Sequence, residues 1–318
     1  MKNLVFQGLV EAARRNEPVA LGIISAVKGS SPQKVGAKAL FYPDGRIVAT
    51  LGGGCLEAEI QHRAIDALRS GEAASFDLVL DHDFGWDDGL ICGGKVLGVI
   101  LPNAQQAGEA FWSQLLERKT ALAWGVKSDF SIVPAPAAPV DAATESTGPG
   151  WLYVETIPQP CALWIAGAGH VAQAVVPLAL QLDFSVRVFD DRPALASHRF
   201  FPPETGLEAD VWDKLLATPL PAQPCFGLIV TRGHRHDALV LEKWIQRPFS
   251  FLGMIGSARK ARMIFEHFLE EGLATAEQLK QVACPVGIKI RSRTVPEIAI
   301  SIVAQLIERR AEVLRPGA

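Results

Sequence analysis

The pattern that most constrains the fold of this chain lies in residues 161–191. The apolar run Cys161-Ala162-Leu163-Trp164-Ile165-Ala166 leads into Gly167-Ala168-Gly169-His170-Val171-Ala172, then a helical pattern and a second apolar run that ends in Asp190-Asp191. Strand, glycine turn, helix, strand and acid in this order are typical of a dinucleotide-binding βαβ unit. The pattern predicts a Rossmann-type, doubly wound parallel sheet in the second half of the chain.

Each residue of this pattern has an expected role. The first glycine, Gly167, makes the turn, and Gly169 lets a pyrophosphate approach the start of the helix. Asp190 or Asp191 follows at the spacing of the acid that binds a ribose hydroxyl. His170 either reaches the ligand or caps the helix. The ligand is a nucleotide such as NAD(P) or another phosphate compound, because Rossmann domains bind both.

A second glycine-rich turn carries a cysteine. Gly52-Gly53-Gly54-Cys55-Leu56-Glu57 follows an apolar strand pattern and precedes a helical run over residues 56–68. Consecutive glycines let the backbone turn sharply and approach a ligand. Unpaired N–H groups at a helix start favour anions, including a thiolate. Cys55 is therefore a candidate ligand or nucleophile, and the alternative is a small buried cysteine.

A third segment repeats this arrangement. Asp87-Asp88-Gly89-Leu90-Ile91-Cys92-Gly93-Gly94 places a cysteine among glycines directly before a strand pattern over residues 95–101. Cys55 and Cys92, with Gly93 and Gly94, therefore predict one shared site. The acidic run 81–88 could be read as a metal loop, but its spacing does not match the calcium-binding loop, and a solvated loop is the simpler interpretation.

Two further loops have the composition of anion sites. Residues 28–36 contain Lys28, Ser30, Ser31 and Lys34, which suit an oxyanion, although an ordinary hairpin loop explains them equally well. His234-Arg235-His236-Asp237 follows a strand pattern, where ligands of parallel sheets lie. This loop is open to three interpretations, namely a metal site, an anion site with Arg232 and Arg235, or a helix cap made by Asp237.

Composition indicates a globular chain of two domains. The chain has 318 residues, of which 49% are hydrophobic and 20% charged. Residues 134–150 are rich in proline, alanine and small polar residues, so we expect a linker there. The predicted domains are 1–133, a mixed α/β domain that carries Cys55 and Cys92, and 151–318, the Rossmann-type domain.

Charge and cysteine content exclude several functions. A net charge of −3 gives no reason to expect nucleic acid or an anionic membrane as a partner. The five cysteines form no CxxC pair, so neither a disulfide framework nor a zinc ribbon is indicated. No apolar run reaches the ~20 residues that span a bilayer, and no signal peptide is visible. These features favour a cytoplasmic protein with reduced thiols.

Taken together, the motifs resemble those of the XdhC/CoxI family of accessory proteins for xanthine dehydrogenase and related molybdenum hydroxylases. In the first half the resemblance is carried by Gly29-Ser30-Ser31-Pro32, Val35-Gly36-Ala37-Lys38, Gly52-Gly53-Gly54-Cys55-Leu56-Glu57 and the segment around Cys92. In the second half it is carried by Gly167-Ala168-Gly169-His170-Val171, Phe189-Asp190-Asp191-Arg192, Thr231-Arg232-Gly233-His234, Gly253-Met254-Ile255-Gly256-Ser257 and Cys284-Pro285-Val286-Gly287.

The resemblance implies a dedicated chaperone for molybdenum cofactor (molybdopterin) that is not itself an enzyme. Such a protein shields the cofactor, supports its sulfuration by a cysteine desulfurase and passes it to the molybdenum subunit of xanthine dehydrogenase. Because molybdenum and its dithiolene are soft, Cys55 and Cys92 are the expected thiolate ligands. A homodimer is also expected.

Two other functions remain open from the sequence. One is an NAD(P)-dependent oxidoreductase that uses Gly167, Gly169 and Asp190, although no separate catalytic set is recognisable. The other is a thiol redox or persulfide carrier that uses Cys55 and Cys92.

Overall fold

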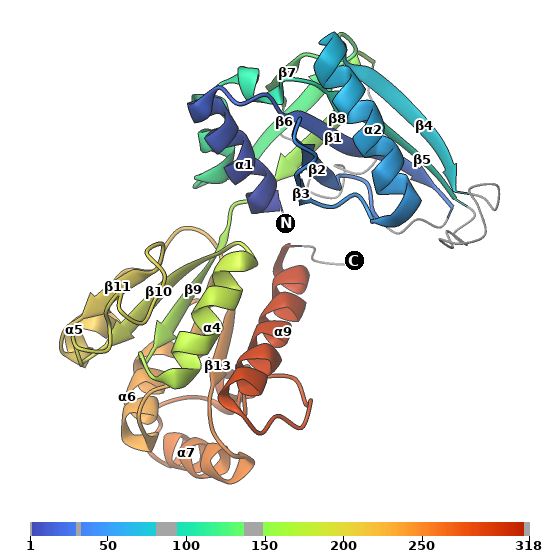
Figure 1. The fold of residues 1–318 in the computed structure, drawn as a ribbon. Helices are drawn as coiled ribbons and strands as arrows, with labels where there is room; N and C mark the ends of the chain where they lie inside the picture. Colours follow the sequence, from blue (N-terminus) through green and yellow to red (C-terminus); the bar gives the residue numbers. More distant parts are fainter. Residues whose placement is uncertain (1, 30–32, 81–93, 137–148, 315–318) are drawn as a thin grey trace. The chain divides into compact units, whose positions relative to one another are not determined.

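The chain folds into two compact units, Met1–Gln159 and Pro160–Ala318. The computed structural model describes residues 2–29, 33–80, 94–136 and 149–314 (Figure 1). Each unit has its own sheets and its own buried core, so each is described by itself.

The first unit is built on a five-stranded antiparallel sheet with the order β3-β2-β1-β5-β4, joined by a three-stranded sheet with the order β7-β6-β8. Its elements are α1 (Lys2–Arg15), β1 (Ala20–Lys28), β2 (Lys38–Phe41), β3 (Ile47–Ala49), α2 (Gly54–Ser70), β4 (Ala74–Leu80), β5 (Gly94–Leu101), the 3₁₀ helix η2 (Ala104–Ala107), α3 (Glu109–Leu116), β6 (Leu122–Lys127), β7 (Ile132–Pro134) and β8 (Trp151–Ile157).

Both faces of the five-stranded sheet are buried. Leu21 and Ile23 of β1 face a core with α1 and α3, whereas Ala20 and Ile24 face a core with α2. Successive side chains of a strand point to opposite faces. A strand covered on both faces therefore reads as a nearly continuous apolar run, as β1 does.

The second unit is a six-stranded parallel sheet with the order β11-β10-β9-β12-β13-β14. Its elements are β9 (Cys161–Ala166), α4 (His170–Gln181), β10 (Phe184–Asp190), β11 (Gly206–Ala209), α5 (Trp212–Ala217), β12 (Cys225–Ile229), α6 (His234–Trp244), β13 (Phe251–Met254), α7 (Ala258–Glu270), α8 (Ala276–Lys280), β14 (Val282–Ala283) and α9 (Val295–Leu314).

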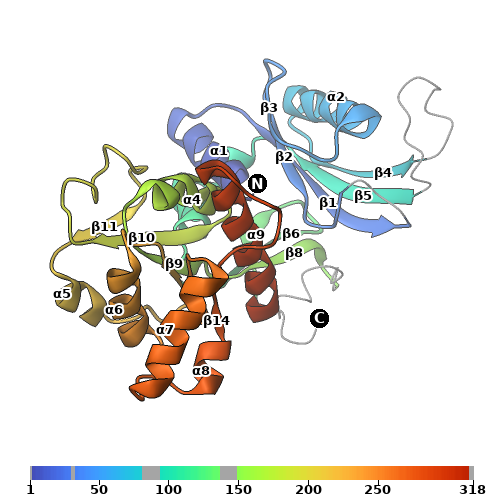
Figure 2. The same ribbon diagram turned by 90° about the horizontal axis from the view of Figure 1, so that it is seen from below.

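Helices cover both faces of this sheet, as the Rossmann-type prediction required. One core joins the sheet to α4 and α9, and the other joins it to α5, α6, α7 and α8. Figure 2 shows α4 and α9 on one side of the strands and α5, α6 and α7 on the other. The α/β fold class and the doubly wound second domain are therefore confirmed.

The domain boundary differs from the expected one. The predicted second domain starts at residue 151, but β8 pairs antiparallel with β6 over Leu122–Lys127 and belongs to the first unit. The boundary therefore lies after Gln159. The cause is a backbone ladder with a distant strand, which local composition does not reveal. Most of the expected linker 134–150 lies outside the described residues.

The helical segment after β5 is divided in two. It forms η2 and then α3, separated by Gly108 at φ +100°. Among the described residues, no helix combines the length and the apolar character needed to cross a membrane.

Candidate functional site

The register of the five-stranded sheet gathers three connections at one end. Lys28, the last residue of β1, lies opposite Lys95 near the start of β5. Gly94, the first residue of β5, lies opposite Leu80, the last residue of β4. The segment that carries Cys92 therefore leaves and re-enters the sheet at the end where β1 finishes.

The glycine–cysteine turn leaves the sheet in the same direction. Ala49 of β3 lies opposite Ala39, the second residue of β2. Because β2 runs antiparallel to β1 and begins opposite Ile23, the turn that follows β3 leaves the sheet in the direction of the end of β1, from a position opposite the middle of that strand. Sequence separation hides this arrangement, which comes from strand pairing alone.

The turn before α2 needs glycine for its backbone conformation. Gly52, Gly53 and Gly54 have φ values of +120°, +72° and +58°, a region that other residues rarely adopt. Space beside Gly53 and Gly54 is open, because a Cβ there would meet nothing within 4 Å. The turn thus exposes bare backbone on one side.

Cys55 lies where the sequence placed it. It is the second residue of α2, whose N-cap residue Gly53 makes no side-chain capping hydrogen bond, and it is a free, half-buried cysteine. A partly accessible thiol therefore lies beside helix N–H groups that no side chain caps, which is an arrangement suited to an anionic or soft ligand.

Glu57 holds this turn in place. Its Oε2 accepts hydrogen bonds from Thr50 Oγ1 at 2.6 Å and from the Leu51 N–H at 2.7 Å, while Thr50 Oγ1 accepts one from the Gly52 N–H at 3.0 Å. The sequence included Glu57 in the motif but did not predict this role. The carboxylate is engaged in supporting the turn that presents Cys55.

A buried ion pair anchors the loop that contains Lys34. Lys38 Nζ lies 2.7 Å from Glu155 Oε2, both side chains being almost fully buried. The same ammonium donates to the Gly36 carbonyl at 2.8 Å and to Tyr153 Oη at 3.0 Å. Sequence reasoning missed Lys38 and Glu155, since a lysine in a short strand pattern gives no sign of burial. Lys34 itself is exposed.

Some expected site residues cannot be placed. Ser30, Ser31, Cys92 and Gly93 lie outside the described residues. The shared site of Cys55 and Cys92 therefore stays a prediction.

The second unit has a topological switch point, and we refer to the region beyond the carboxyl ends of β10, β9 and β12 as the switch-point crevice. In the sheet order, β9 lies between β10 and β12, so the chain winds outward from β9 in both directions. Ligands of such sheets bind beyond the carboxyl ends of the strands on either side of this point. Gly169 and Gly233 are the N-cap residues of α4 and α6, which follow β9 and β12.

The glycines at this crevice differ in why they are glycine. Gly167 has φ +111°, and a Cβ there would lie 2.4 Å from the Val230 carbonyl oxygen, so the fold itself requires glycine. Gly169 has φ −75° and Gly233 has φ 176°, values open to any residue. A Cβ on either would meet nothing within 4 Å. These two positions leave room that the chain itself does not fill.

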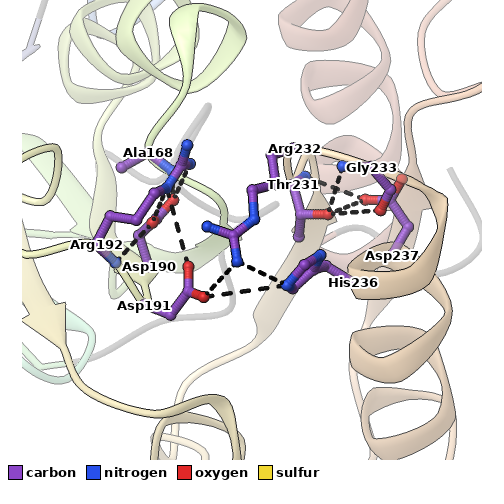
Figure 3. A network of polar contacts seen from close by, with 9 residues as sticks. All are labelled: Ala168, Asp190, Asp191, Arg192, Thr231, Arg232, Gly233, His236 and Asp237. Atoms are coloured by element: carbon purple, nitrogen blue, oxygen red, sulfur yellow. Dashed lines mark hydrogen bonds and ion pairs between the residues drawn. The ribbon is translucent and has the colours of Figure 1, made fainter.

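Asp190 is buried beneath this crevice, 1% exposed. One oxygen accepts from the Ala168 N–H at 2.7 Å and from Arg192 Nη2 at 2.8 Å; the other accepts from Arg192 Nε at 2.7 Å and from the Arg192 N–H at 2.9 Å (Figure 3). Burial alone would raise the pKa of Asp190, but the hydrogen bonds from Arg192 and Ala168 outweigh it and hold the pKa below its ordinary value.

Asp191 joins the two sides of the crevice. Its Oδ2 lies 2.9 Å from Arg232 Nη2 and 4.0 Å from His236 Nε2, and the same Arg232 nitrogen lies 3.0 Å from that ring nitrogen. Figure 3 shows Arg232 reaching across to Asp191. Asp191 is thus paired with a residue that follows β12.

The His234–Asp237 segment forms the start of α6. His234 is the first helical residue and is exposed. Asp237 is fully buried and accepts hydrogen bonds from Thr231 Oγ1 at 2.6 Å and from Lys260 Nζ at 2.5 Å. It therefore ties the loop after β12 to α7. No cluster of three or more potential ligands from His, Cys, Asp and Glu occurs among the described residues, so the metal interpretation of this segment gains no support.

His170 and three cysteines, Cys161, Cys225 and Cys284, also lie in the second unit. His170 is the first residue of α4 and is exposed. Burial raises the pKa of Cys161 and of Cys284 to about 11 and that of Cys225 to about 12. A raised pKa keeps the proton on each of these three thiols at neutral pH.

Comparison with protein-family models gives two matches. The model of the XdhC and CoxI family matches residues 12–81, and the model of the XdhC Rossmann domain matches residues 163–306. Together they cover the Cys55 turn in the first unit and the switch-point crevice in the second.

Similar proteins match over nearly the whole chain at modest identity. Uncharacterized protein YqeB of Escherichia coli K12 is 25% identical over 96% of this chain, which spans only 46% of that relative. A probable xanthine dehydrogenase subunit from Bacillus subtilis 168 is 24% identical, with 93% of this chain and 94% of the relative covered. The molybdenum cofactor insertion chaperone PaoD of E. coli K12 is 26% identical, with 95% and 86% covered.

A solved structure shares the fold. The crystal structure of a xanthine dehydrogenase from Bacillus halodurans superposes with a TM-score of 0.78 at 24% identity, covering 98% of this chain and 97% of the other.

Proposed function

Because this chain belongs to the XdhC and CoxI family, we propose that it is a molybdenum cofactor insertion chaperone. The observation that carries the proposal is the likeness to a molybdenum cofactor insertion chaperone over 95% of this chain. The client is xanthine dehydrogenase or a related molybdenum hydroxylase, in line with the B. subtilis relative, whose name is that of a probable xanthine dehydrogenase component.

The Cys55 turn fits one end of such a cofactor. A molybdenum dithiolene is a soft centre that favours thiolate ligands. Cys55 presents a half-buried thiol from the start of α2, and the bare backbone at Gly53 and Gly54 lets a bulky ligand come close. Cys92 completes the thiolate pair in this proposal, since its segment starts and ends at the same end of the sheet.

Two places suit the phosphate of a pterin cofactor. One is the first unit, where Lys28 and Lys34 are exposed on the connection beside the Cys55 turn and Ser30 and Ser31 lie between them in sequence. The other is the switch-point crevice with Gly169. Ammonium groups and helix N-termini both bind phosphate. Variants in the two units separate these possibilities.

The proposed chain of events needs no turnover by this protein. Its residues bind the cofactor, hold it away from oxidants while a cysteine desulfurase supplies sulfur, and release it to the apo-hydroxylase. With these partners, the protein is expected to act in the cytoplasm. A homodimer is part of the proposal.

Co-purification tests the proposal. The protein is expressed in a host that makes molybdenum cofactor, and the pure protein is assayed for molybdenum by mass spectrometry and for pterin by fluorescence. We expect both in the wild type and a loss of at least about tenfold in Cys55→Ala and in Cys92→Ala. Cys161→Ala, which removes a buried thiol at the amino end of β9, is the matched control and keeps its cofactor.

The outcomes distinguish the alternatives. Wild-type protein without pterin or molybdenum contradicts the proposal. If both cysteine variants retain pterin and molybdenum, the thiolate site is rejected but the chaperone function is not. Gly169→Ala adds only a methyl group to an open space at ordinary φ, so a loss of pterin in that folded variant places the phosphate at the switch-point crevice.

A further inference from the structure

The Rossmann-type unit raises the question of whether it binds a nicotinamide dinucleotide, which this fold commonly holds. We infer that it excludes NAD and NADP, because Asp190, Asp191, Arg192 and Arg232 are committed to one another at the place where a ribose would be read. The inference does not rest on the proposed function.

Asp190 is the residue at the ribose position, and both of its carboxylate oxygens already accept hydrogen bonds from the chain itself. A ribose is recognised when its hydroxyls donate to an accessible carboxylate at the end of the second strand. Both oxygens of Asp190 already accept two N–H donors each, from Ala168 and Arg192, and the residue is 1% exposed. The carboxylate fixes the glycine turn to β10 and does not face the crevice as a free acceptor.

Arg192 excludes the phosphorylated dinucleotide for the same reason. An arginine near this acid accommodates the 2′-phosphate of NADP in domains that prefer it. Here Arg192 makes a bidentate pair with Asp190, because its Nε and Nη2 each donate a hydrogen bond to a different carboxylate oxygen, at 2.7 and 2.8 Å. Releasing the guanidinium for a phosphate would leave the buried Asp190 carboxylate without its counter-charge.

The next acid in the chain is also engaged. Asp191 follows β10 and pairs with Arg232, which follows β12, at 2.9 Å. Because β9 lies between these two strands, the pair passes over the carboxyl end of β9, where a dinucleotide would cross the sheet. Figure 3 shows the Arg232 side chain between Asp191 and His236.

Nucleotide titration of the full chain tests the inference. Wild-type protein is mixed with NAD⁺, NADH or NADP⁺ up to about 1 mM, the upper end of ordinary enzyme–substrate affinities. Binding is followed by calorimetry and by the thermal unfolding midpoint. We expect no saturable heat and no rise of the midpoint, whereas a ligand at about 100 times its Kd raises the midpoint by several degrees.

A matched pair of variants tests the reason. Asp190→Asn places an amide N–H against the donors of Arg192, so we expect the midpoint to fall by roughly 5–10 °C. Asp191→Asn alters the partly exposed contacts with Arg232, His236 and Arg192, so we expect a fall of less than about 2 °C. Neither variant is expected to change the absence of nucleotide binding.

Two results overturn the inference. One is saturable binding of any of the three nucleotides by the wild type. The other is an Asp190→Asn protein as stable as the wild type, because the carboxylate would then be free for a ligand. If Asp190→Asn does not fold, the wild-type titration decides alone. If the protein carries pterin and also binds NAD⁺, only this inference is refuted. If it carries no pterin and does not bind NAD⁺, only the proposed function is refuted.

Discussion

The buried pair Lys38–Glu155 shows how a single contact sets the position of a loop. Both side chains are withdrawn from water, and the lysine also holds the Gly36 carbonyl at the end of the loop that contains Lys34. A buried charge whose partner is removed is strongly destabilising, whereas the intact pair need not stabilise the fold over an apolar pair. The pair therefore matters most for where the loop lies.

Removing one partner of this pair tests that view. Lys38→Met removes the buried counter-charge of the Glu155 carboxylate, so we expect the free energy of unfolding to fall by about 3–5 kcal/mol. Lys38→Met/Glu155→Gln removes the charge but keeps an acceptor for Trp124 Nε1, which lies 3.2 Å from Glu155 Oε2. We expect the double variant to have a free energy of unfolding at least about 1 kcal/mol higher than that of Lys38→Met, as measured by urea unfolding. Equal stability of the single and double variants would reject this account.

Cys225 links stability to alkaline pH. Burial raises the pKa of this thiol from about 9 to about 12, with Arg247 partly opposing the rise. The unfolded chain loses this proton first as the pH rises, so the stabilisation is complete below about pH 9 and is lost towards about pH 12. The slope from one such group is about 1.4 kcal/mol per pH unit.

The variant Cys225→Ala isolates this contribution. Its loss of a buried sulfur is independent of pH, so its stability relative to the wild type should stay constant below about pH 9 and improve steadily from there towards about pH 12. Urea unfolding of both proteins across this range provides the measurement. Parallel stability curves would show that Cys225 does not titrate differently in the two states.

At the scale of the element, the glycine turns explain which motif residues serve the fold and which leave room for a ligand. Gly167 packs against the backbone of Val230 and has positive φ, whereas Gly169 has neither constraint. The two glycines look equivalent in the sequence, but the fold requires glycine only at the first of them. Only the backbone angles and the neighbours separate them.

Substituting each glycine by alanine tests the distinction. Gly167→Ala forces a Cβ to within 2.4 Å of the Val230 carbonyl oxygen, so we expect a loss of more than about 2 kcal/mol or failure to fold. Gly169→Ala is expected to change the unfolding free energy by less than about 1 kcal/mol. Chemical denaturation of the two variants compares them directly, and a reversed order of stability would contradict the structure.

On the scale of the whole molecule, the two units are separate cores joined after Gln159. β8 completes the three-stranded sheet of the first unit through its pairing with β6. The second sheet begins with β9 and involves no strand from before residue 160. The second unit thus contains all of its own sheet and covering helices.

Two fragments test this boundary. A fragment of residues 160–318 is expected to fold and to be as stable as one of residues 151–318, because β8 adds nothing to the second sheet. Circular dichroism with thermal unfolding measures both. A fragment 151–318 that is markedly more stable would restore the boundary expected from composition.

The sequence by itself determined the α/β class, the Rossmann-type second half and the helix start at Cys55. These features depend on apolar runs, glycine turns and the spacing to Asp190. All three are patterns of neighbouring residues, so they can be read directly from the sequence. The end of the first domain was less accurate, because the pairing of β8 with β6 joins strands that are distant in sequence.

Tertiary structure alone decided how the motif residues are used. The direction in which the Cys55 turn and the connections after β1 and β4 leave the sheet follows from antiparallel register. The burial of Lys38 with Glu155 and the commitment of Asp190 to Arg192 arise from side-chain packing and hydrogen bonding in the folded chain. A carboxylate has the same sequence signature whether it is free for a ribose or occupied by an arginine. Only the positions of its neighbours distinguish the two.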